Sequence, residues 1–422
     1  MRLRSRTVAT LGVVVVLATA CDPGQRSSEF VRIDSAGVTI ATSRAPASSL
    51  TPVFTVAGEP RLRIGVVDGA EELQFSDLGG MVRLDDGRIV VANGRPPEIR
   101  TYTPTGSFLK RLGREGDGPG EFRYLDALMR GGGDTVLAVS MPRFELLRFT
   151  IGAGYVDTWT MPRATIASAL GDRRPAEGLG EYLRNGSIVI AARPKSVILE
   201  DGNNFPTGQL FRRQFTAVWI DHDGARSEVL GELGGIQQLF IDIGGGQRTA
   251  VIPPSSRRSI NARNGDGSRV CVAGNDEPEV RCVDDDGTRL IIRWTQDTVL
   301  TPREEAMRWR EGFRESAAGP GSRTSPQIAE KVIAGMIIPP TVPPIRDILV
   351  DNEKRVLVGG PDLSAANGWR RYRVFSADGE LLGTAEFPAF AVYELGEDYA
   401  VGRARDADGV EFVVVYDITR TR

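Results

Sequence analysis

The chain has 422 residues, of which 41% are hydrophobic and 25% are charged. Its 55 acidic residues outnumber its 52 basic residues, and the resulting net charge of −3 argues against a nucleic acid as partner. The only histidine, His222, lies in a predicted hairpin turn, so a zinc site built from several histidines is excluded. A Ser-His-acid triad would need this same turn residue, and the sequence contains no Gly-x-Ser-x-Gly motif.

Residues 1–20 have the pattern of a secretory signal peptide. A basic start is followed by an apolar stretch that is too short to span a bilayer stably, and small residues then precede Cys21. A cysteine at the cleavage point resembles the lipobox of bacterial lipoproteins, in which this cysteine receives the lipid. The usual leucine lies one place earlier than expected, at Leu17. An ordinary cleaved signal with an incidental cysteine is the alternative.

Residues 21–50 are expected to form a lipidated, flexible N-terminal segment, because the polar stretch 22–28 suits a spacer. No later segment approaches the length and apolarity of a transmembrane span, so the lipid on Cys21 would be the only membrane anchor. We therefore expect a lipid-anchored, extracytoplasmic protein of the bacterial cell envelope, facing either the periplasm or the cell surface.

Residues 51–422 repeat one unit, in which a turn opens a short apolar run and a second turn follows. The copies begin within residues 86–91, 133–138, 185–190, 267–272, 352–357 and 397–401. Each continues into a further β-prone run, and turn pairs such as Asp378-Gly379 are typical of hairpins. With a leading strand, such as 77–84, each unit has about four strands, as propeller blades do.

The apolar runs predict how these units pack. The run 89–92 is apolar without alternation, which indicates strands buried on both faces. Sheets stacked face to face around an axis bury such strands, so the pattern predicts an all-β, six-bladed β-propeller with four-stranded blades. The sixth unit ends after 411–417 without an outer strand. The segment 52–56 is expected to close the ring by completing this blade, and 37–41 is a competing candidate.

One motif resembles a known repeat. Residues 116–122, Gly-Asp-Gly-Pro-Gly-Glu-Phe, together with 86–93, 98–100 and 106–109, look like an NHL-type propeller repeat. The chain is similar to the six-bladed, NHL-repeat-like β-propeller lipoproteins of bacteria, most closely over residues 75–125 and in weaker form from 126 to 419. The resemblance implies the fold but no activity, because propellers host many unrelated functions.

Two cysteines remain after Cys21. Cys271 and Cys282 lie on two apolar runs separated by the turn-forming segment 273–278. If the runs pair antiparallel about this turn, the two cysteines face each other within disulfide reach. We expect a disulfide, which agrees with an oxidising compartment; two buried free thiols are the alternative.

A small helical hairpin insertion is expected at about 301–336. Residues 301–304, Thr-Pro-Arg-Glu, predict a capping box with Pro302 at the first helical position, and Ser325-Pro326 begins a second helix. We expect this hairpin to lie against one face of the ring. The Gly-rich segment 234–256 has no predicted shape.

Three aspartates are candidate ligands of a metal ion in the central channel. Asp77, Asp126 and Asp347 fall on or near the innermost strands of three blades, and Ca²⁺ prefers converging carboxylate oxygens. Gluconolactonase-like six-bladed propellers use such an ion for ester hydrolysis, so a metal-dependent hydrolase is the alternative function. In the other interpretation these aspartates cap strands or bond neighbouring backbone amides.

The preferred interpretation is a binding module rather than an enzyme. Loops on one face of a rigid propeller commonly form a binding surface, so we expect a monomeric, membrane-tethered module that binds a protein, a peptide or a glycan. No catalytic residue and no cofactor are expected for this function.

Overall fold

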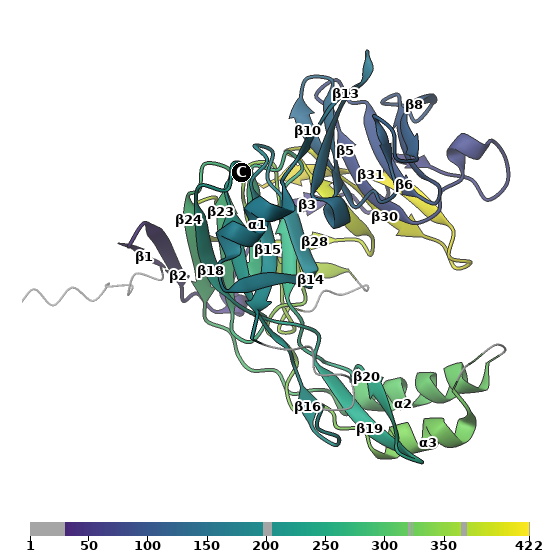
Figure 1. Ribbon diagram of the computed structural model, residues 1–422, viewed down its shortest axis with the longest axis vertical. Coiled ribbons are helices and arrows are strands. Elements are labelled where there is room, and N and C mark those ends of the chain that lie inside the picture. The colour runs from purple at the N-terminus through teal and green to yellow at the C-terminus, as the bar shows by residue number, and fades with distance from the viewer. Residues whose placement is uncertain (1–29, 197–204, 320–321, 323, 364–368, 422) are drawn as a thin grey trace, which may run out of the picture.

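The computed structural model describes residues 30–196, 205–319, 322, 324–363 and 369–421. Residues 1–20 and Cys21 lie outside this range. Strands dominate the described residues, which contain 31 β-strands and three α-helices, so the expected mostly-β fold is confirmed (Figure 1). None of the described helices has the length and apolar character needed to cross a membrane.

Most strands belong to six groups of antiparallel neighbours, here called sheets 1 to 6. Within each group the chain runs up and down, so strands that follow each other in sequence are hydrogen-bonded. The first three are sheet 1, with β5 (Leu78–Arg83), β6 (Ile89–Gly94), β7 (Pro97–Tyr102) and β8 (Phe108–Glu115); sheet 2, with β10 (Ala127–Gly132), β11 (Thr135–Ser140), β12 (Glu145–Thr150) and β13 (Gly154–Thr160); and sheet 3, with β14 (Arg173–Tyr182), β15 (Ile188–Pro194), β17 (Gln214–Ile220) and β18 (Ser227–Gly234).

The remaining three groups follow the same pattern. They are sheet 4, with β21 (Ile260–Arg263), β22 (Arg269–Ala273), β23 (Glu279–Asp284) and β24 (Arg289–Trp294); sheet 5, with β25 (Asp347–Val350), β26 (Val356–Gly359), β27 (Arg370–Phe375) and β28 (Leu381–Phe387); and sheet 6, with β29 (Ala391–Leu395), β30 (Tyr399–Arg405) and β31 (Glu411–Arg420). The short β9 (Glu121–Phe122) pairs with β8 in parallel. Single 3-10 turns occur at Ala47–Ser49, Glu71–Leu73 and Met141–Arg143.

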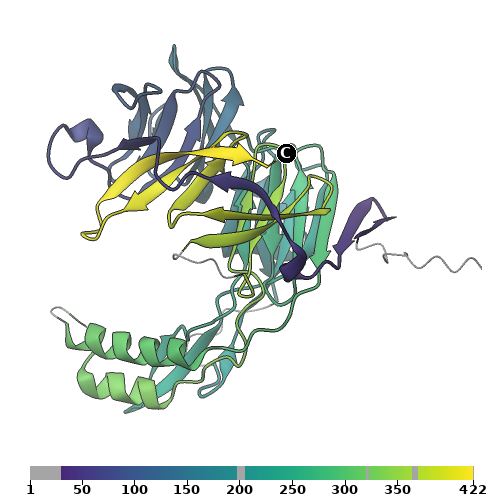
Figure 2. The same cartoon turned by 180° about the vertical axis from the view of Figure 1, so that it is seen from behind.

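Sheet 6 takes its missing edge from the N-terminal part of the chain. The short β4 (Leu62–Ile64) pairs antiparallel with β31 and is the fourth strand of this sheet. The expected segment, β3 (Pro52–Val56), instead lies between sheets 5 and 6, parallel to β28 and antiparallel to the end of β31. Both β3 and β4 can pair with β31, because this strand is ten residues long. Figure 2 shows this purple N-terminal segment alongside the yellow C-terminal strands.

The N-terminal segment departs from expectation in a second way. Residues 30–43, expected in a flexible tether, form a hairpin of β1 (Phe30–Ser35) and β2 (Val38–Ser43). β2 pairs in parallel with β24 and so extends sheet 4. The competing candidate for closing the ring, 37–41, therefore lies on a different sheet. Its partner is β24 because the outer edge of sheet 4 was free to accept it.

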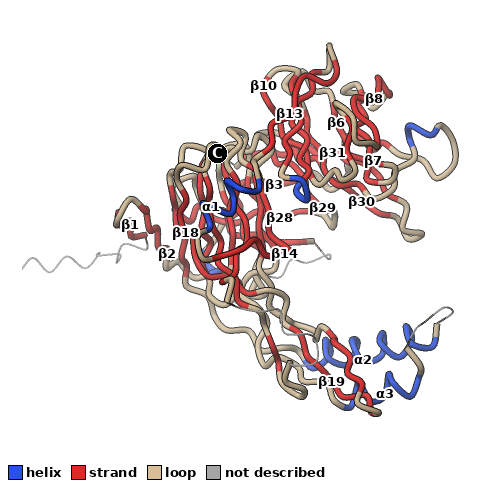
Figure 3. The backbone as a smooth tube through the Cα atoms, viewed as in Figure 1, coloured by secondary structure: helices blue, strands red, loops and turns tan. Residues whose placement is uncertain are grey.

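Each apolar core lies between two successive sheets. Val90 of sheet 1 shares a core with Leu147 of sheet 2, and four similar cores join sheets 2 to 6 in order. A sixth core brings Met81 of sheet 1 together with Val401 of sheet 6. The packing order therefore returns to its starting point. The helix α1 (Arg163–Leu170) contributes to the core between sheets 2 and 3 (Figure 3).

Three insertions meet to form a separate arm. They follow β15, β18 and β24, and they supply β16 (Leu210–Phe211), the hairpin of β19 (Gln238–Gly244) and β20 (Gln247–Val251), and the helices α2 (Arg303–Ala318) and α3 (Pro326–Ala334). The helices pack on the small sheet β16–β19–β20 through a core of their own. Figure 1 shows this arm projecting away from sheets 1 to 6. The expectation that the helices lie against a ring face is wrong, because the segment 234–256 supplies their partner sheet.

The two helix starts were predicted with unequal success. Pro302 is the N-cap of α2 and makes no side-chain cap, while the hydroxyl of Thr301 donates to the carbonyl of Pro339 at 2.7 Å. The predicted capping box is therefore wrong. Ser325 does cap α3, since its hydroxyl accepts the backbone N–H of Ile328 at 3.3 Å.

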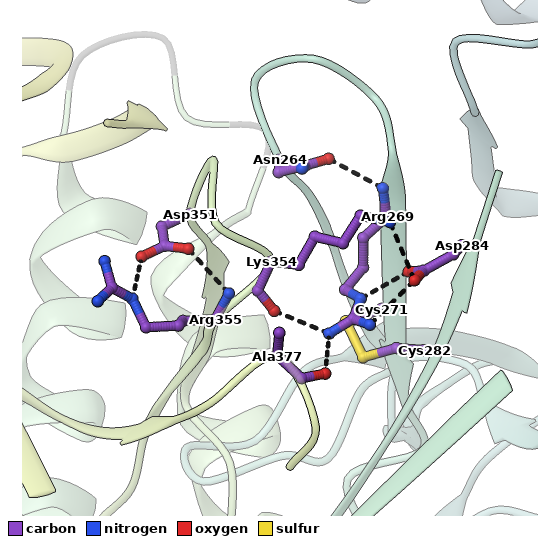
Figure 4. Close-up of a disulfide and its surroundings, with 9 residues drawn as sticks. All are labelled: Asn264, Arg269, Cys271, Cys282, Asp284, Asp351, Lys354, Arg355 and Ala377. Carbon is purple, nitrogen blue, oxygen red and sulfur yellow. Dashed lines mark hydrogen bonds and ion pairs between the residues drawn. A yellow bond between two sulfur atoms is a disulfide. The ribbon is translucent and has the colours of Figure 1, made fainter. Parts of the chain in front are cut away.

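A disulfide joins two buried strands of sheet 4 (Figure 4). Cys271 lies directly opposite Cys282 in the register of β22 and β23, and the two form a disulfide. Next to it, the guanidinium of Arg269 forms an ion pair with Asp284 at 2.7 Å. The same guanidinium donates to the carbonyl of Ala377 at 2.8 Å, which ties sheet 4 to sheet 5.

We predict that Phe54→Ala lowers the free energy of unfolding by about 3–5 kcal/mol, the usual cost of truncating a buried phenylalanine. Phe54 is 2% exposed and belongs to the core between sheets 5 and 6. Urea denaturation measures the change. The control Ile33→Ala, at a side chain that is 56% exposed on β1, should stay within about 0.5 kcal/mol of wild type. A loss below about 1 kcal/mol for Phe54→Ala would show that β3 contributes little to closure.

We also predict that the double variant Cys271→Ala/Cys282→Ala loses about 3 kcal/mol of stability, because the short closed loop no longer restricts the unfolded chain. Denaturation of the variant, and of wild type with and without reductant, measures this loss. Wild type in reductant should resemble the variant. Equal stability of all three samples would contradict the prediction.

Candidate functional site

The three candidate metal ligands do not come together. Asp77 pairs with Arg95 at 3.3 Å, and Asp126 accepts the backbone N–H of Met141 at 2.9 Å. Burial raises the pKa of the Asp126 carboxyl. Asp347 lies elsewhere, in a cleft described below. Among the described residues, no group of three or more His, Cys, Asp or Glu side chains could hold a metal ion. Asp126 and Asp347 each accept a backbone N–H, from Met141 and Ile348, whereas Asp77 pairs with a guanidinium.

A buried carboxylate joins several of the sheets. Glu394 of sheet 6 is fully buried, accepts the backbone N–H of Arg83 at 2.6 Å and pairs with Arg130 at 2.7 Å. It also accepts the side-chain amide of Asn352 at 2.9 Å, and Asn352 in turn accepts the N–H of Gly265 at 3.2 Å. These contacts link sheets 1, 2, 4, 5 and 6. Burial raises the pKa of the Glu394 carboxyl, but its oxygens are fully engaged, so this group is structural.

The best candidate site is a cleft at the base of the arm, here called the arm-base cleft. It has two adjoining lobes of about 620 and 580 Å³, which share Arg258 and Asp347. The first lobe lies among sheets 3 and 4 and the start of β19, and the second lies along the beginnings of β25 and β27. The remaining lining residues that matter chemically are Arg213, Phe215 and Ile236 in the first lobe and Arg346, Trp369, Arg370, Arg371 and Tyr372 in the second.

The arm-base cleft carries an excess of positive charge. Five arginines and one aspartate are the charged residues among the described residues that line it. Arg371 pairs with Glu386, and Arg370 lies 3.7 Å from Asp347. Arg258 and Arg346 are both exposed, and neither side chain has an ion pair within the described part of the chain. Positive charge without a protein partner therefore remains in both lobes.

One acceptor lies among these arginines. The side chain of Asp347 is 38% exposed, and its Oδ2 accepts the hydroxyl of Tyr372 at 2.9 Å. Burial raises the pKa of Tyr372, with the nearby Asp347 charge acting in the same direction, so the phenol remains a donor at neutral pH. This contact, with the backbone N–H of Ile348 that donates to Oδ1 at 2.9 Å, orients the Asp347 carboxyl at the boundary between the two lobes.

Three backbone N–H groups in and beside the wall of the first lobe are already paired. The N–H of Gly235 donates to the carbonyl of Arg213 at 2.8 Å, that of Gln237 to Arg257 at 2.8 Å, and that of Ser259 to Gly234 at 2.9 Å. These three N–H groups are therefore not available to a ligand. The ring of Phe215 in this lobe and that of Trp369 in the other are partly exposed and provide apolar surface.

Sequence reasoning missed this cleft, although a signal was present. Arginine doublets occur at 212–213, 257–258 and 370–371, each just before or at the start of a strand. In the first two doublets one member is anchored: Arg212 pairs with Asp276 at 2.6 Å and Arg257 lies 3.7 Å from the same carboxylate. The other member, Arg213 or Arg258, lines the cleft. Only the fold shows that these separate segments meet.

Comparisons with known proteins leave the family open. No family model matches the chain, and no curated protein matches it. Among solved structures, an exported-protein candidate from Bacteroides fragilis is 9% identical, covers 91% of this chain and 100% of its own, and has a TM-score of 0.42. A member of the DUF4221 family from Bacteroides vulgatus is 10% identical over 87% of this chain and 98% of its own, with a TM-score of 0.43.

A third solved structure, the calcium-binding protein regucalcin from Agrobacterium tumefaciens, is 13% identical over 88% of this chain and 98% of its own, with a TM-score of 0.35. At these identities and scores none of the likenesses carries a conclusion about what this protein does.

Proposed function

We propose that this protein is a six-bladed β-propeller of the bacterial cell envelope, that it serves as a binding module, and that the arm-base cleft binds its protein, peptide or glycan partner. Sheets 1 to 6 would be the blades, with β4 as the outer strand of the last one. The circular order of the six cores supports this count, since each unit packs on two neighbours and the sixth meets the first. The NHL-like run 116–122 lies between sheets 1 and 2, as a blade linker would.

The proposed location rests on chemistry at two places. The N-terminal sequence resembles a lipoprotein signal that ends at Cys21. The buried disulfide between Cys271 and Cys282 agrees with an oxidising compartment, because disulfides are rare in reducing cytosol. We propose a monomer that is tethered to the membrane by lipid on Cys21.

The observation that carries the proposed binding function is the uncompensated charge in the arm-base cleft. Arg258 and Arg346 are exposed and have no ion pair among the described residues, so their guanidinium groups, together with the other arginines of this concave site, are available to bind an anionic ligand. The cleft is formed by strand starts and insertions anchored in sheets 3, 4 and 5, and such a scaffold holds these side chains in place.

We predict that Arg258→Ala/Arg346→Ala reduces partner capture at least about tenfold, because each charge-assisted hydrogen bond contributes about 1.5–3 kcal/mol. Crosslinking in native membranes, followed by quantification of the crosslinked species, measures this. The matched control is Arg44→Ala/Arg308→Ala, which removes two exposed arginines that line neither lobe. If the cleft variant retains every crosslinked species, the arm-base cleft is not the binding site.

We predict that Cys21→Ser releases the protein from the membrane fraction and lowers the mass of the mature chain by that of the lipid. Fractionation and intact-mass analysis give the two readouts. Loss of the thiol should affect neither folding nor the disulfide, since Cys21 precedes the described strands. Lipidation would be rejected if wild type and Cys21→Ser differed in mass only by the substitution and were equally associated with the membrane.

A further inference from the structure

We infer that the ligand of the arm-base cleft is an acidic glycan, a chain of sugars that carry carboxylates. This inference rests on the proposed binding function and names the chemical class of the ligand. It follows from the positions of the arginines in the cleft, from the carboxylate of Asp347 among them and from the hydrogen bonds that backbone N–H groups of the wall already make.

The cations are spread along the cleft rather than gathered at one point. Arg213 lines only the first lobe and Arg346 only the second, while Arg258 lines both. A guanidinium presents its donors in a planar fork that matches a carboxylate with two parallel hydrogen bonds. Each lobe lies within the range of about 300–1,000 Å³ typical of small-molecule sites. The cleft therefore suits an oligomer that carries anions at intervals, with one end in each lobe.

The position of Asp347 requires donors on the same ligand. Its carboxylate lines both lobes beside Arg258. Oδ2 accepts from Tyr372 and Oδ1 accepts the backbone N–H of Ile348, both at 2.9 Å, and each oxygen keeps a second lone pair. A chain that offered only anions would be repelled at this point. A sugar carries hydroxyl donors next to its carboxylate, so it can satisfy the arginines and Asp347 together.

The wall of the cleft disfavours a peptide bound as an added strand. Such binding needs free N–H groups at a sheet edge. On the edge strand β25 the N–H of Ile348 already donates to the Asp347 carboxylate at 2.9 Å, and the N–H groups of Gly235, Gln237 and Ser259 are paired within the protein. A sugar chain has no peptide backbone to pair and can be held through side chains alone. The partly exposed rings of Phe215 and Trp369 offer flat apolar surface against which a sugar ring can pack.

The test is calorimetric titration of the full-length protein with three tetramers: tetragalacturonate, neutral galactotetraose and tetraglutamate. We expect tetragalacturonate to bind at least about tenfold more tightly than either of the others, and its affinity to fall with added salt. Arg258→Ala/Arg346→Ala should weaken it at least about tenfold, while Arg44→Ala/Arg308→Ala should change it less than about twofold.

Asp347→Asn separates the two ligand chemistries. Removal of a repelling charge should strengthen any residual tetraglutamate binding, whereas tetragalacturonate should gain less or lose affinity, because an amide oxygen is a weaker acceptor for its hydroxyls than a carboxylate. The amide oxygen can replace only one of the two carboxylate oxygens, which accept from the hydroxyl of Tyr372 and from the N–H of Ile348, so the folding of the variant is checked before binding is compared. Circular dichroism of the variant provides the check on folding.

Failure of the inference is distinguishable from failure of the proposed function. If tetraglutamate binds as tightly as tetragalacturonate, or if tetragalacturonate does not bind while Arg258→Ala/Arg346→Ala abolishes crosslinking, the acidic-glycan assignment is wrong and the binding function stands. If no tetramer binds and the crosslinks survive in that variant, both are wrong.

Discussion

The arrangement of the sheets depends on one buried carboxylate. Glu394 meets the backbone of sheet 1, Arg130 of sheet 2 and Asn352 of sheet 5, at the point where the inner strands approach one another. A buried ion that loses one partner is strongly destabilising, because the remaining charge stays desolvated. Sheets 1, 2 and 5 are therefore each held in a position from which they contact the two carboxylate oxygens of Glu394. The apolar cores between neighbouring sheets contribute most of the buried surface, but they act only between adjacent pairs. The carboxylate instead couples sheets that are not neighbours.

The attachment of the arm to the sheets forms the proposed binding site. Its three insertions enter and leave at the same end of sheets 3, 4 and 5. Each insertion follows the second or fourth strand of a sheet and precedes a third or first strand, and in an antiparallel sheet these strand termini lie at the same end. Their bases bring Arg213, Arg258 and Arg346 together, although these residues belong to separate segments. The arm has its own core of buried residues from β19, β20 and α3. It can thus vary in sequence without disturbing the sheets, while its attachment shapes the cleft.

Local signals in the sequence were sufficient to predict the repeated sheets and the pairing of the two cysteines. Turn residues and unbroken apolar runs determine structure over only a few positions, so they can be recognised without knowledge of the fold. Non-local pairing was harder to predict. β4 has only three residues, too few to show a period, so the longer β3 was preferred as the closing strand. Residues 30–43 were expected in a flexible segment, with 37–41 only as a candidate closing strand, because the sheet edge that β2 meets lies some 250 residues later, at Arg289. The cleft was missed for the same reason, since arginines at 213, 258 and 346 become neighbours only when three insertions fold back.

The β1–β2 hairpin has a consequence for how the protein sits at a membrane. Because it fastens the chain to sheet 4 from Phe30 onward, only residues 22–29 separate a lipid on Cys21 from the folded body. Eight residues reach at most about 29 Å when fully extended. That distance is comparable to the thickness of the hydrocarbon core of one bilayer. If Cys21 carries the proposed lipid, this short segment would keep the outer edge of sheet 4 within that distance of the membrane surface.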